Sequence, residues 1–418
     1  MGGWTLMEMW KILFGLLFTR WPSCGIRMDT NTGAPDGLCS TFVEPYYSKY
    51  DCHEYSTVTP DGFRLGLQRI NSRSDSGQKG PLLLNHGVLN GGDAWVLNSP
   101  DEFDVSPAFV LADAGYDVWI GNARTTRYSY GHEKLTEEDE AYWDWSFDEL
   151  AAFDLPSMMY LVHNVTNKKI HYIGHSQGTQ SALAALSEGK LIDIVNKVAL
   201  LAPVAYDSHI WTPLLAGAAV LHLDQLVKML GFNKFSTKTP QGKQYVDLIC
   251  QEGNLDCDKD YVTAFTGTNC CFNYSKFPFY DQYETQSTST KNLVHLAQLY
   301  RADKFQKYDY GAAENNQRYN SIYPPAYDLS KVPTQNLLLV YGGLDPLADL
   351  VDVQRLKNEL SPGYKYLFKP NFAHLDFIVA NNCKQQLYDE VMAFFEDEQN
   401  MGITFFENLA SNGDTGMQ

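Results

Sequence analysis

The stretch that decides the fold reads Lys169-Ile170-His171-Tyr172-Ile173-Gly174-His175-Ser176-Gln177-Gly178. Its apolar first half predicts a buried parallel strand, and residues 177–187 behind it favour a helix. Gly174 and Gly178 flank Ser176 in the pattern G-x-S-x-G, which sets a serine on a sharp turn between a strand and a helix. Glycine at those two positions leaves room for the crowded turn. The motif therefore predicts that Ser176 is a nucleophile presented at the carboxyl end of a sheet.

Strands and helices alternate on both sides of this motif. Further apolar strands are predicted at residues 81–87, 116–121, 197–203, 336–343 and 364–369, and further helices at residues 107–114, 147–164 and 376–398. Residues 56–70 predict two strands around the Asp61-Gly62 turn. Because the central strands are apolar throughout, the pattern predicts an α/β fold with a mostly parallel central sheet and helices on both faces.

The alternation stops between residues 206 and 325, which predicts an inserted domain rich in helices and loops. Residues 210–230 are its most apolar part, but Asp224 and Lys228 interrupt them, so we expect an amphipathic helix rather than a membrane span. The predicted organisation is a core of residues 59–205 and 326–400, a cap of residues 206–325, an N-terminal extension of residues 26–58 and a polar tail of residues 401–418.

The amino terminus is typical of a signal peptide. Residues 12–18 are an apolar run far too short to cross a bilayer, and the small residues Ser23 and Gly25 follow it. We interpret residues 1–25 as a signal peptide; a buried N-terminal helix is the alternative. The chain would then enter the secretory pathway and end outside the cell or in a vacuolar or lysosomal lumen.

Cysteine usage agrees with an oxidising compartment. None of the eight cysteines has the paired spacing of a zinc site. Cys39 and Cys52 could close a loop. Four more cysteines lie between residues 250 and 271, a density that favours disulfides, and they allow three pairings among which the sequence does not choose. Asn164 and Asn273 begin sequons for glycosylation.

The overall charge excludes some partners. The 418 residues carry a net charge of −18 at pH 7, and no long basic run interrupts the acidic balance. Nucleic acid and anionic membrane surfaces are therefore poor partners. An uncharged lipid is compatible with this charge, as are many other neutral substrates.

A serine nucleophile needs a base, and the base needs a group to orient it. On this kind of fold the acid and then the histidine follow the serine, each on a loop after a late strand. His374 follows the predicted strand 364–369 and precedes the last helix, so we assign it as the base. His295 lies in a helical part of the insertion and is interpreted as structural.

The acid is assigned to Asp345, which follows the predicted strand 336–343 in Gly342-Gly343-Leu344-Asp345-Pro346. Two glycines and a proline make a tight turn that can aim the carboxylate inward. Asp349 and Asp352 are rivals further from the strand end, with Asp352 expected in the next helix. Asp376 is interpreted as the N-cap of the last helix.

An oxyanion hole requires two backbone N–H groups. One is predicted at Gln177, directly after the nucleophile, and the other at Val88, in the loop after the strand 81–87. Glycines around Val88 suit a backbone that approaches the substrate closely. His86 could be read as a second base, but a packing or hydrogen-bonding role in the loop is favoured.

At these motifs the chain resembles the acid lipase family of α/β-hydrolases, which includes lysosomal acid lipase, gastric lipase and the plant triacylglycerol lipases. The resemblance runs over most of residues 38–400 and is carried by residues 84–88, 118–124, 143–150, 154–156, 174–178, 342–345 and 374–377. The cysteine cluster resembles the plant members in particular. The resemblance implies the α/β-hydrolase fold with a helical cap, cleavage of triacylglycerols or sterol esters, and no metal or other cofactor.

Two positions depart from the family pattern. The family commonly has Asn before the catalytic histidine, where this chain has Ala373, and the usual G-N-x-R-G segment ends here in Thr125. Neither departure touches Ser176, Asp345 or His374, so it bears on substrate detail rather than on activity.

The sequence thus predicts a serine lipase that acts on neutral lipid at a lipid–water interface, with no nucleic-acid partner and no stable transmembrane anchor. A carboxylesterase or phospholipase of the same fold remains an alternative. So does a lipid-binding protein on an inactive hydrolase scaffold, although that reading predicts a broken triad position and none is broken.

Overall fold

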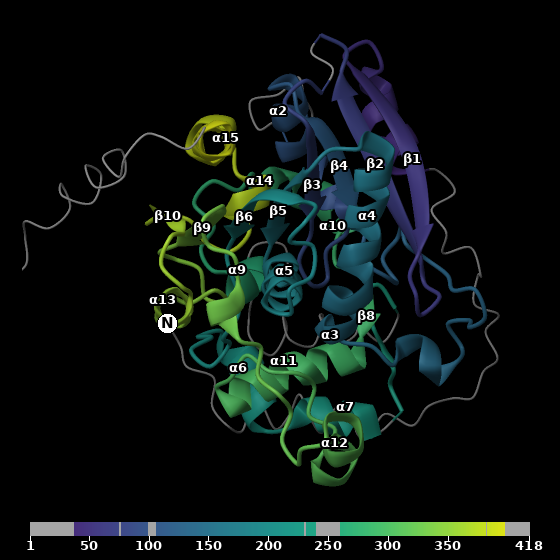
Figure 1. Cartoon of the computed structure of the whole chain (residues 1–418), viewed down its shortest axis with the longest axis vertical. Coiled ribbons are helices and arrows are strands. Elements are labelled where there is room, and N and C mark those ends of the chain that lie inside the picture. The colour runs from purple at the N-terminus through teal and green to yellow at the C-terminus, as the bar shows by residue number, and fades with distance from the viewer. Residues whose placement is uncertain are drawn as a thin grey trace, which may run out of the picture.

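The computed structural model describes residues 37–74, 77–98, 106–229, 231–239, 260–381 and 383–397. Its centre is an eight-stranded sheet with the order β1-β2-β4-β3-β5-β6-β9-β10 (Figure 1). The strands are β1 (Tyr50–Val58), β2 (Arg64–Ser72), β3 (Pro81–Asn85), β4 (Asp117–Gly121), β5 (Ile170–His175), β6 (Val195–Leu201), β9 (Leu337–Gly342) and β10 (Lys365–Lys369). The six strands from β4 to β10 in this order run parallel, and β1 and β2 are antiparallel at one edge. The predicted mostly parallel sheet is confirmed.

The antiparallel edge corrects one predicted boundary. Strand β1 begins at Tyr50, inside the range predicted as an N-terminal extension of residues 26–58. It pairs with β2 along its whole length, from Tyr50 opposite Ser72 to Val58 opposite Arg64. Tyr50 is the only buried residue of β1, so the strand lacks the apolar alternation of a half-buried strand, and the sequence pattern did not reveal its first half.

Helices cover both faces of the sheet, as predicted. Leu83 of β3 packs into a cluster with Met158, whereas its neighbour Leu84 packs into a separate cluster with Phe109 and Phe395. Successive residues of a strand face opposite sides, so the two clusters are the two faces of the sheet. The helices of the core are α2 (Pro107–Asp113), α3 (Phe147–Glu149), η5 (Leu150–Asp154), α4 (Leu155–Thr166), α5 (Gln177–Ser187), α13 (Leu350–Glu359), α14 (Asp376–Val379), η8 (Lys384–Tyr388) and α15 (Asp389–Glu396).

The last predicted helix, residues 376–398, is interrupted. Helix α14 ends at Val379 because Ala380 adopts an extended conformation and forms a bridge with Phe272 of the insertion. Helical structure resumes in η8 and continues through α15. Asp376 is the first residue of α14 rather than its N-cap, which is Leu375.

The insertion forms a helical cap, whose helices α6, α7, α11 and α12 group at one end of the molecule (Figure 1). Residues 210–230 form two short helices rather than one, because His222 between them has a φ of 53°. The described elements of the cap are α6 (Pro213–Val220), α7 (Leu223–Met229), β7 (Lys234–Phe235), α9 (Asp260–Thr266), η6 (Tyr274–Lys276), α10 (Phe277–Tyr283), β8 (Thr288–Ser289), α11 (Thr290–Ala302) and α12 (Ala312–Tyr319). Short turns elsewhere are η1 (Cys39–Val43), η2 (Glu44–Tyr46), η3 (Gly92–Trp95), η4 (Glu140–Trp143) and η7 (Leu329–Lys331).

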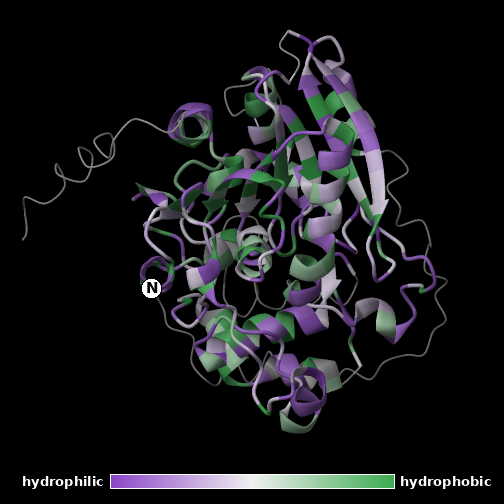
Figure 2. Ribbon diagram, in the orientation of Figure 1, coloured by the Kyte–Doolittle hydropathy of each residue, from purple (hydrophilic) through white to green (hydrophobic). Residues whose placement is uncertain are grey.

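Hydrophobic residues concentrate on the central strands (Figure 2). Helix α6 of the cap contains only apolar or small residues and is also coloured mostly as hydrophobic. Among the described residues, none of the helices is both long enough and apolar enough to cross a membrane. The predicted signal peptide lies outside the described residues.

A disulfide joins Cys39 to Cys52 and ties η1 to strand β1, as the spacing of these cysteines suggested. Within the cluster of four, Cys270 and its neighbour Cys271 are joined. The other two members, Cys250 and Cys257, lie outside the described residues.

Candidate active site

Ser176 occupies a strained turn between β5 and α5. Its backbone angles are φ 53° and ψ −120°, a conformation that costs a non-glycine residue about 1–3 kcal/mol and persists only where the surroundings enforce it. The space around the turn requires glycine. A Cβ on Gly174 would lie 2.8 Å from a backbone atom of Gly178, and one on Gly87 would lie 2.8 Å from the Cβ of Ser176. The predicted strand–turn–helix setting of the motif is confirmed.

Asp345 and His374 meet at the ends of adjacent strands. Asp345 follows β9 and His374 follows β10, and Nδ1 of His374 lies 3.0 and 2.9 Å from the two carboxylate oxygens of Asp345. A carboxylate can only accept, so Nδ1 carries the proton and Nε2 is left with a lone pair. This is the tautomer that a base needs to take a proton from a hydroxyl.

The Asp345 carboxylate is held ionised although it is fully buried. Burial would raise the pKa of this carboxyl, but the His374 ring and the backbone amides of Leu347 and Ala348 outweigh burial and hold the pKa below its usual value. Both amides donate to Oδ1 at 2.9 Å. The tight turn predicted from the glycines and proline therefore supplies two of the groups that stabilise the charge.

The rival acids have other partners. Asp349 caps helix α13 by accepting from the amide of Val351, and Asp352 lies inside that helix, where it accepts from His209. Asp376 accepts from the amides of Ala373, Cys270 and Cys271. Of the rival bases, His295 is buried in α11 between Ser146 and the carbonyl of Gln306, in agreement with a structural role.

The neighbour of the serine supports the histidine loop. His175 donates from Nε2 to the carbonyl oxygen of His374 at 2.8 Å, and the two rings lie 4.8 Å apart. Burial, followed by the nearby His374, lowers the pKa of His175 to about 3. The ring is thus neutral under ordinary conditions and acts as a fixed donor to the backbone of His374.

Residues 86–92 form a loop, which we call the 86–92 loop. Its Gly87 lies against the turn at Ser176. His86 uses both ring nitrogens within this region: Nε2 accepts from the amide of Ala123 at 3.0 Å, so Nδ1 carries the proton and donates to the carbonyl oxygen of Gly87 at 2.8 Å. Burial lowers the pKa of His86 to about 4. These contacts favour the loop-supporting role over a role as a second base. Val88 follows directly, and Gln177 begins helix α5 on the other side of Ser176.

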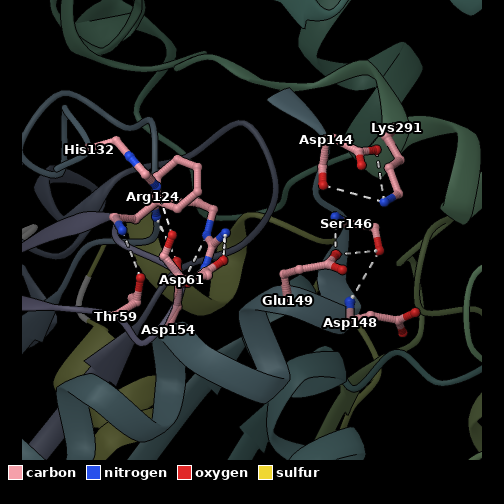
Figure 3. Close-up of polar contacts among 11 residues, drawn as sticks. Thr59, Asp61, Arg124, His132, Asp144, Ser146, Asp148, Glu149, Asp154 and Lys291 are labelled. Atoms are coloured by element: carbon pink, nitrogen blue, oxygen red, sulfur yellow. Dashed lines mark hydrogen bonds and ion pairs between the residues drawn. The ribbon is translucent and has the colours of Figure 1, made fainter. Parts of the chain in front are cut away.

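Arg124, shortly after strand β4, forms a buried ion pair with two carboxylates (Figure 3). The side chain of Arg124 is fully buried and binds Asp154 at 2.6 Å and Asp61 at 2.7 Å. Its backbone amide also donates to Asp154, and the preceding residue is Ala123, whose amide binds His86. Because the guanidinium of Arg124 binds both carboxylates, the buried charges are paired, and this pairing offsets the cost of burying them. This arrangement fixes the position of the ring that supports the 86–92 loop.

Figure 3 also shows how the cap meets the core beside the site. Ser146 and Glu149 form a capping box at the start of α3. The Nζ of Lys291, at the start of cap helix α11, lies 3.0 Å from Oδ1 of Asp144, in the core loop just before Ser146. Since the side chain of Lys291 is almost completely buried, this ion pair helps to fix the amino-terminal end of α11 against the core.

The cap reaches the candidate site at two points that the sequence did not reveal. The amide of His374 donates to the carbonyl oxygen of Thr266, and the amide of Leu375 donates to Asn269 at 3.0 Å. On the other side, the amide groups of Gln177 and Asn292 bind each other at 3.1 and 2.9 Å. These partners lie 106 and 115 residues apart in sequence, and no local motif marks them.

Comparison with known proteins agrees with this geometry. Residues 80–380 match the family described as alpha/beta hydrolase fold, and residues 46–99 match the partial alpha/beta-hydrolase lipase region. The chain is 41% identical to triacylglycerol lipase 1 of Arabidopsis thaliana, over 87% of this chain and 91% of that protein. It is 32% identical to gastric triacylglycerol lipase of Rattus norvegicus, over 93% and 100%.

A solved structure shows the same fold at low identity. A soluble variant of monoglyceride lipase from Saccharomyces cerevisiae aligns with a TM-score of 0.52 at 14% identity, over 83% of this chain and 95% of that one. The chain has the α/β-hydrolase fold with the strained turn at Ser176, and it is similar to these lipases over nearly their whole length. The chain therefore belongs to the acid lipase family of α/β-hydrolases.

Proposed function

We propose that the protein is a serine lipase that hydrolyses carboxylic esters of neutral lipids, with triacylglycerol as the principal substrate and sterol ester as a second one. The observation that carries the proposal is the strained turn at Ser176 beside an Asp345–His374 pair whose tautomer leaves Nε2 free to act as a base. The names of the relatives support triacylglycerol.

The reaction would proceed through an acyl-enzyme. His374 takes the proton of Ser176, whose oxygen attacks the ester carbonyl, and the amides of Val88 and Gln177 stabilise the oxyanion. His374 then gives the proton to the departing alcohol, and water releases the fatty acid by the same route. Asp345 orients the imidazole and stabilises its positive form throughout.

The surface of the cap supports a lipid–water interface as the place of action. Ser176, Asp345 and His374 are 8%, 2% and 4% exposed, so a lipid can reach them only if covering residues move. Trp211, Val220 and Met229 of the cap are 54%, 59% and 84% exposed. Large apolar side chains of the cap that are exposed to solvent favour contact with a lipid phase.

The compartment we propose is the secretory pathway, with the extracellular space or an acidic lumen as the destination. The Cys39–Cys52 disulfide supports it, since such bonds persist in oxidising compartments. The exposed sequon residue Asn164, near the end of α4, is accessible for glycosylation.

The test is hydrolysis of emulsified triacylglycerol and of cholesteryl ester by the wild type, Ser176→Ala and the matched exposed control Ser330→Ala. We expect fatty-acid release by the wild type and the control, and a loss on the order of 10⁴-fold or more in Ser176→Ala. Hydrolysis of a short soluble ester alone would favour a carboxylesterase, hydrolysis of phospholipid a phospholipase, and no turnover of any ester by folded wild type a lipid-binding scaffold.

A further inference from the structure

A short cap segment is tied by three hydrogen bonds to the 86–92 loop and to Asp93, the residue after it. The amide of Gln286 donates to the carbonyl oxygen of Leu89 at 2.7 Å, and the side-chain amide of Gln286 donates to Asp93, directly after the loop, at 2.6 Å. The side-chain amide of Asn90 donates to Glu284 at 2.9 Å. Residues 284–286 therefore contact the loop on either side of its tip.

The loop needs such support because its conformation is strained. Leu89, next to the candidate oxyanion donor Val88, has a φ of 62°, which costs an L-residue roughly 1–2 kcal/mol. Gly91 packs so closely on the cap that a Cβ there would lie 2.1 Å from the side-chain nitrogen of Gln286. If the cap segment withdrew, Leu89 would relax and the amide of Val88 would lose its fixed place.

Two carboxyl groups at this contact are incompletely satisfied. One oxygen of Asp93 and one of Glu284 are buried and have no hydrogen-bond partner among the residues that the structure describes. Two ionised carboxylates could not satisfy each other, because both only accept. A proton on either group would remove one of the two buried negative charges and turn that carboxyl into a donor.

The charged groups around the pair do not supply enough positive charge to keep both ionised. Burial raises the pKa of Asp93 to about 7, although the Arg127 guanidinium lowers it. Burial and then the Asp93 charge raise the pKa of Glu284 well above its usual value, against the effect of Lys238, which is itself paired with Asp281. The other titratable groups facing Asp93 are Tyr128 and, beyond it, Glu54, neither of which adds positive charge.

We propose that Asp93 and Glu284 share one proton and, in that form, position the 86–92 loop for catalysis, so that the oxyanion hole is complete at acidic pH and loosens when the proton leaves to solvent. Loss of the proton leaves two buried carboxylates at this contact, and their mutual repulsion and poor solvation separate the cap segment from the loop. The inference rests on the proposed function, because it concerns the oxyanion donor of the same site.

The second oxyanion donor provides an internal contrast. Gln177 is held by Asn292, in the first turn of α11, through two neutral amide hydrogen bonds. Neither group titrates, so this side of the hole keeps its support at every pH. Only the Val88 side carries the shared proton.

The activity test compares Glu284→Gln and Asp93→Asn with the wild type and with Glu314→Gln, a control on α12 whose half-buried carboxylate pairs with Arg318. Each variant leaves a single carboxyl group at the contact, so two negative charges cannot form there at any pH, and we expect the alkaline limb of the kcat/KM profile to move up by about one pH unit or more in both variants. The control should keep the wild-type profile. A folded Glu284→Gln whose alkaline limb coincides with that of the wild type would overturn the proposal.

A second measurement needs only the wild type. Hydrogen exchange of the 86–92 amides, corrected for intrinsic rates and referenced to strand β5, should lose protection as the pH rises from about 5 to about 9. Unchanged protection over that range would contradict the proposal even if both variants failed to fold. Because exchange does not depend on turnover, pH-dependent loosening without ester hydrolysis would reject the proposed function alone, whereas hydrolysis without loosening would reject this inference alone.

Discussion

At the scale of single residues, the contact between Asp345 and His374 is the part of the proposed mechanism that a single substitution tests most directly. Both carboxylate oxygens face Nδ1, and two backbone amides hold the charge in place. In Asp345→Asn the new side-chain N–H₂ can face Nδ1 and favour the tautomer whose Nε2 carries the proton. We expect kcat to fall on the order of 10³–10⁴-fold while the fold is kept.

This expectation is checked by steady-state kinetics on a soluble ester, with circular dichroism to confirm folding. Asp349→Asn is the matched control, since Asp349 caps α13 from the same loop without touching His374. A loss below about tenfold in Asp345→Asn would show that another group orients the base.

Single residues also mark the limit of prediction from sequence. The positions of Ser176, Asp345 and His374 could be predicted because each follows a strand that the apolar pattern located, and strand ends converge at one edge of the sheet. Asn292 and Asn269 could not, because their contacts with the site join segments more than 100 residues apart and depend on how the cap sits on the core. In the sequence, Asn292 and Asn269 look like ordinary polar residues of a helix and of a loop.

At the scale of elements, the segment after α9 fixes the loop that carries His374. Gly267 has a φ of 83°, and a Cβ there would lie 2.4 Å from the carbonyl oxygen of Leu344 and 3.1 Å from the Cβ of Ala373. It thus lies between the Asp345 loop and the His374 loop. We expect Gly267→Ala to lower the free energy of unfolding by about 1–3 kcal/mol and to reduce kcat strongly, by separating the two loops.

Gly231→Ala is the matched control for this change. Gly231 has a nearly identical φ of 79° but nothing within 4 Å of the added Cβ, so it carries the same backbone strain without the clash. Chemical denaturation and kinetics of both variants separate the two effects. Equal kcat values for the two variants would mean that the contact between the loops does not matter for catalysis.

Element boundaries were predictable where hydrophobic periodicity is continuous and not where tertiary contacts override it. The helix predicted at residues 177–187 matches α5 in full. The breaks at His222 and Ala380 escaped prediction because neither residue is a helix breaker. His222 adopts a left-handed conformation, and Ala380 leaves the helix to pair with Phe272 of the cap.

At the scale of the whole molecule, several buried carboxyl groups favour acidic conditions. Burial raises the pKa of Asp93 to about 7, that of Asp207 to about 8 and that of Asp376 to about 6. Groups whose pKa is raised on folding contribute their full stability below the unfolded value near pH 4, and that contribution is lost as the pH rises through the folded value. Asp345 has the opposite sign and opposes very low pH.

We therefore expect the melting temperature to be higher at about pH 5 than at about pH 8, measured by differential scanning calorimetry in buffers of equal ionic strength. Asp207→Asn should flatten this dependence, because it removes the group whose folded pKa is highest among the three. A melting temperature that is equal or higher at about pH 8 would contradict the prediction.

The way the cap meets the core has a consequence for protein engineering. Lid domains of hydrolases are attractive modules for exchange between scaffolds, on the assumption that they only choose the substrate. Here residues 266–269 support the loop of His374, and residues 284–292 support the 86–92 loop and Gln177. A chimaera with a foreign lid would keep the three proposed catalytic residues but lose these supporting contacts. Transplants should therefore move these two segments together with the 86–92 loop, as one cassette.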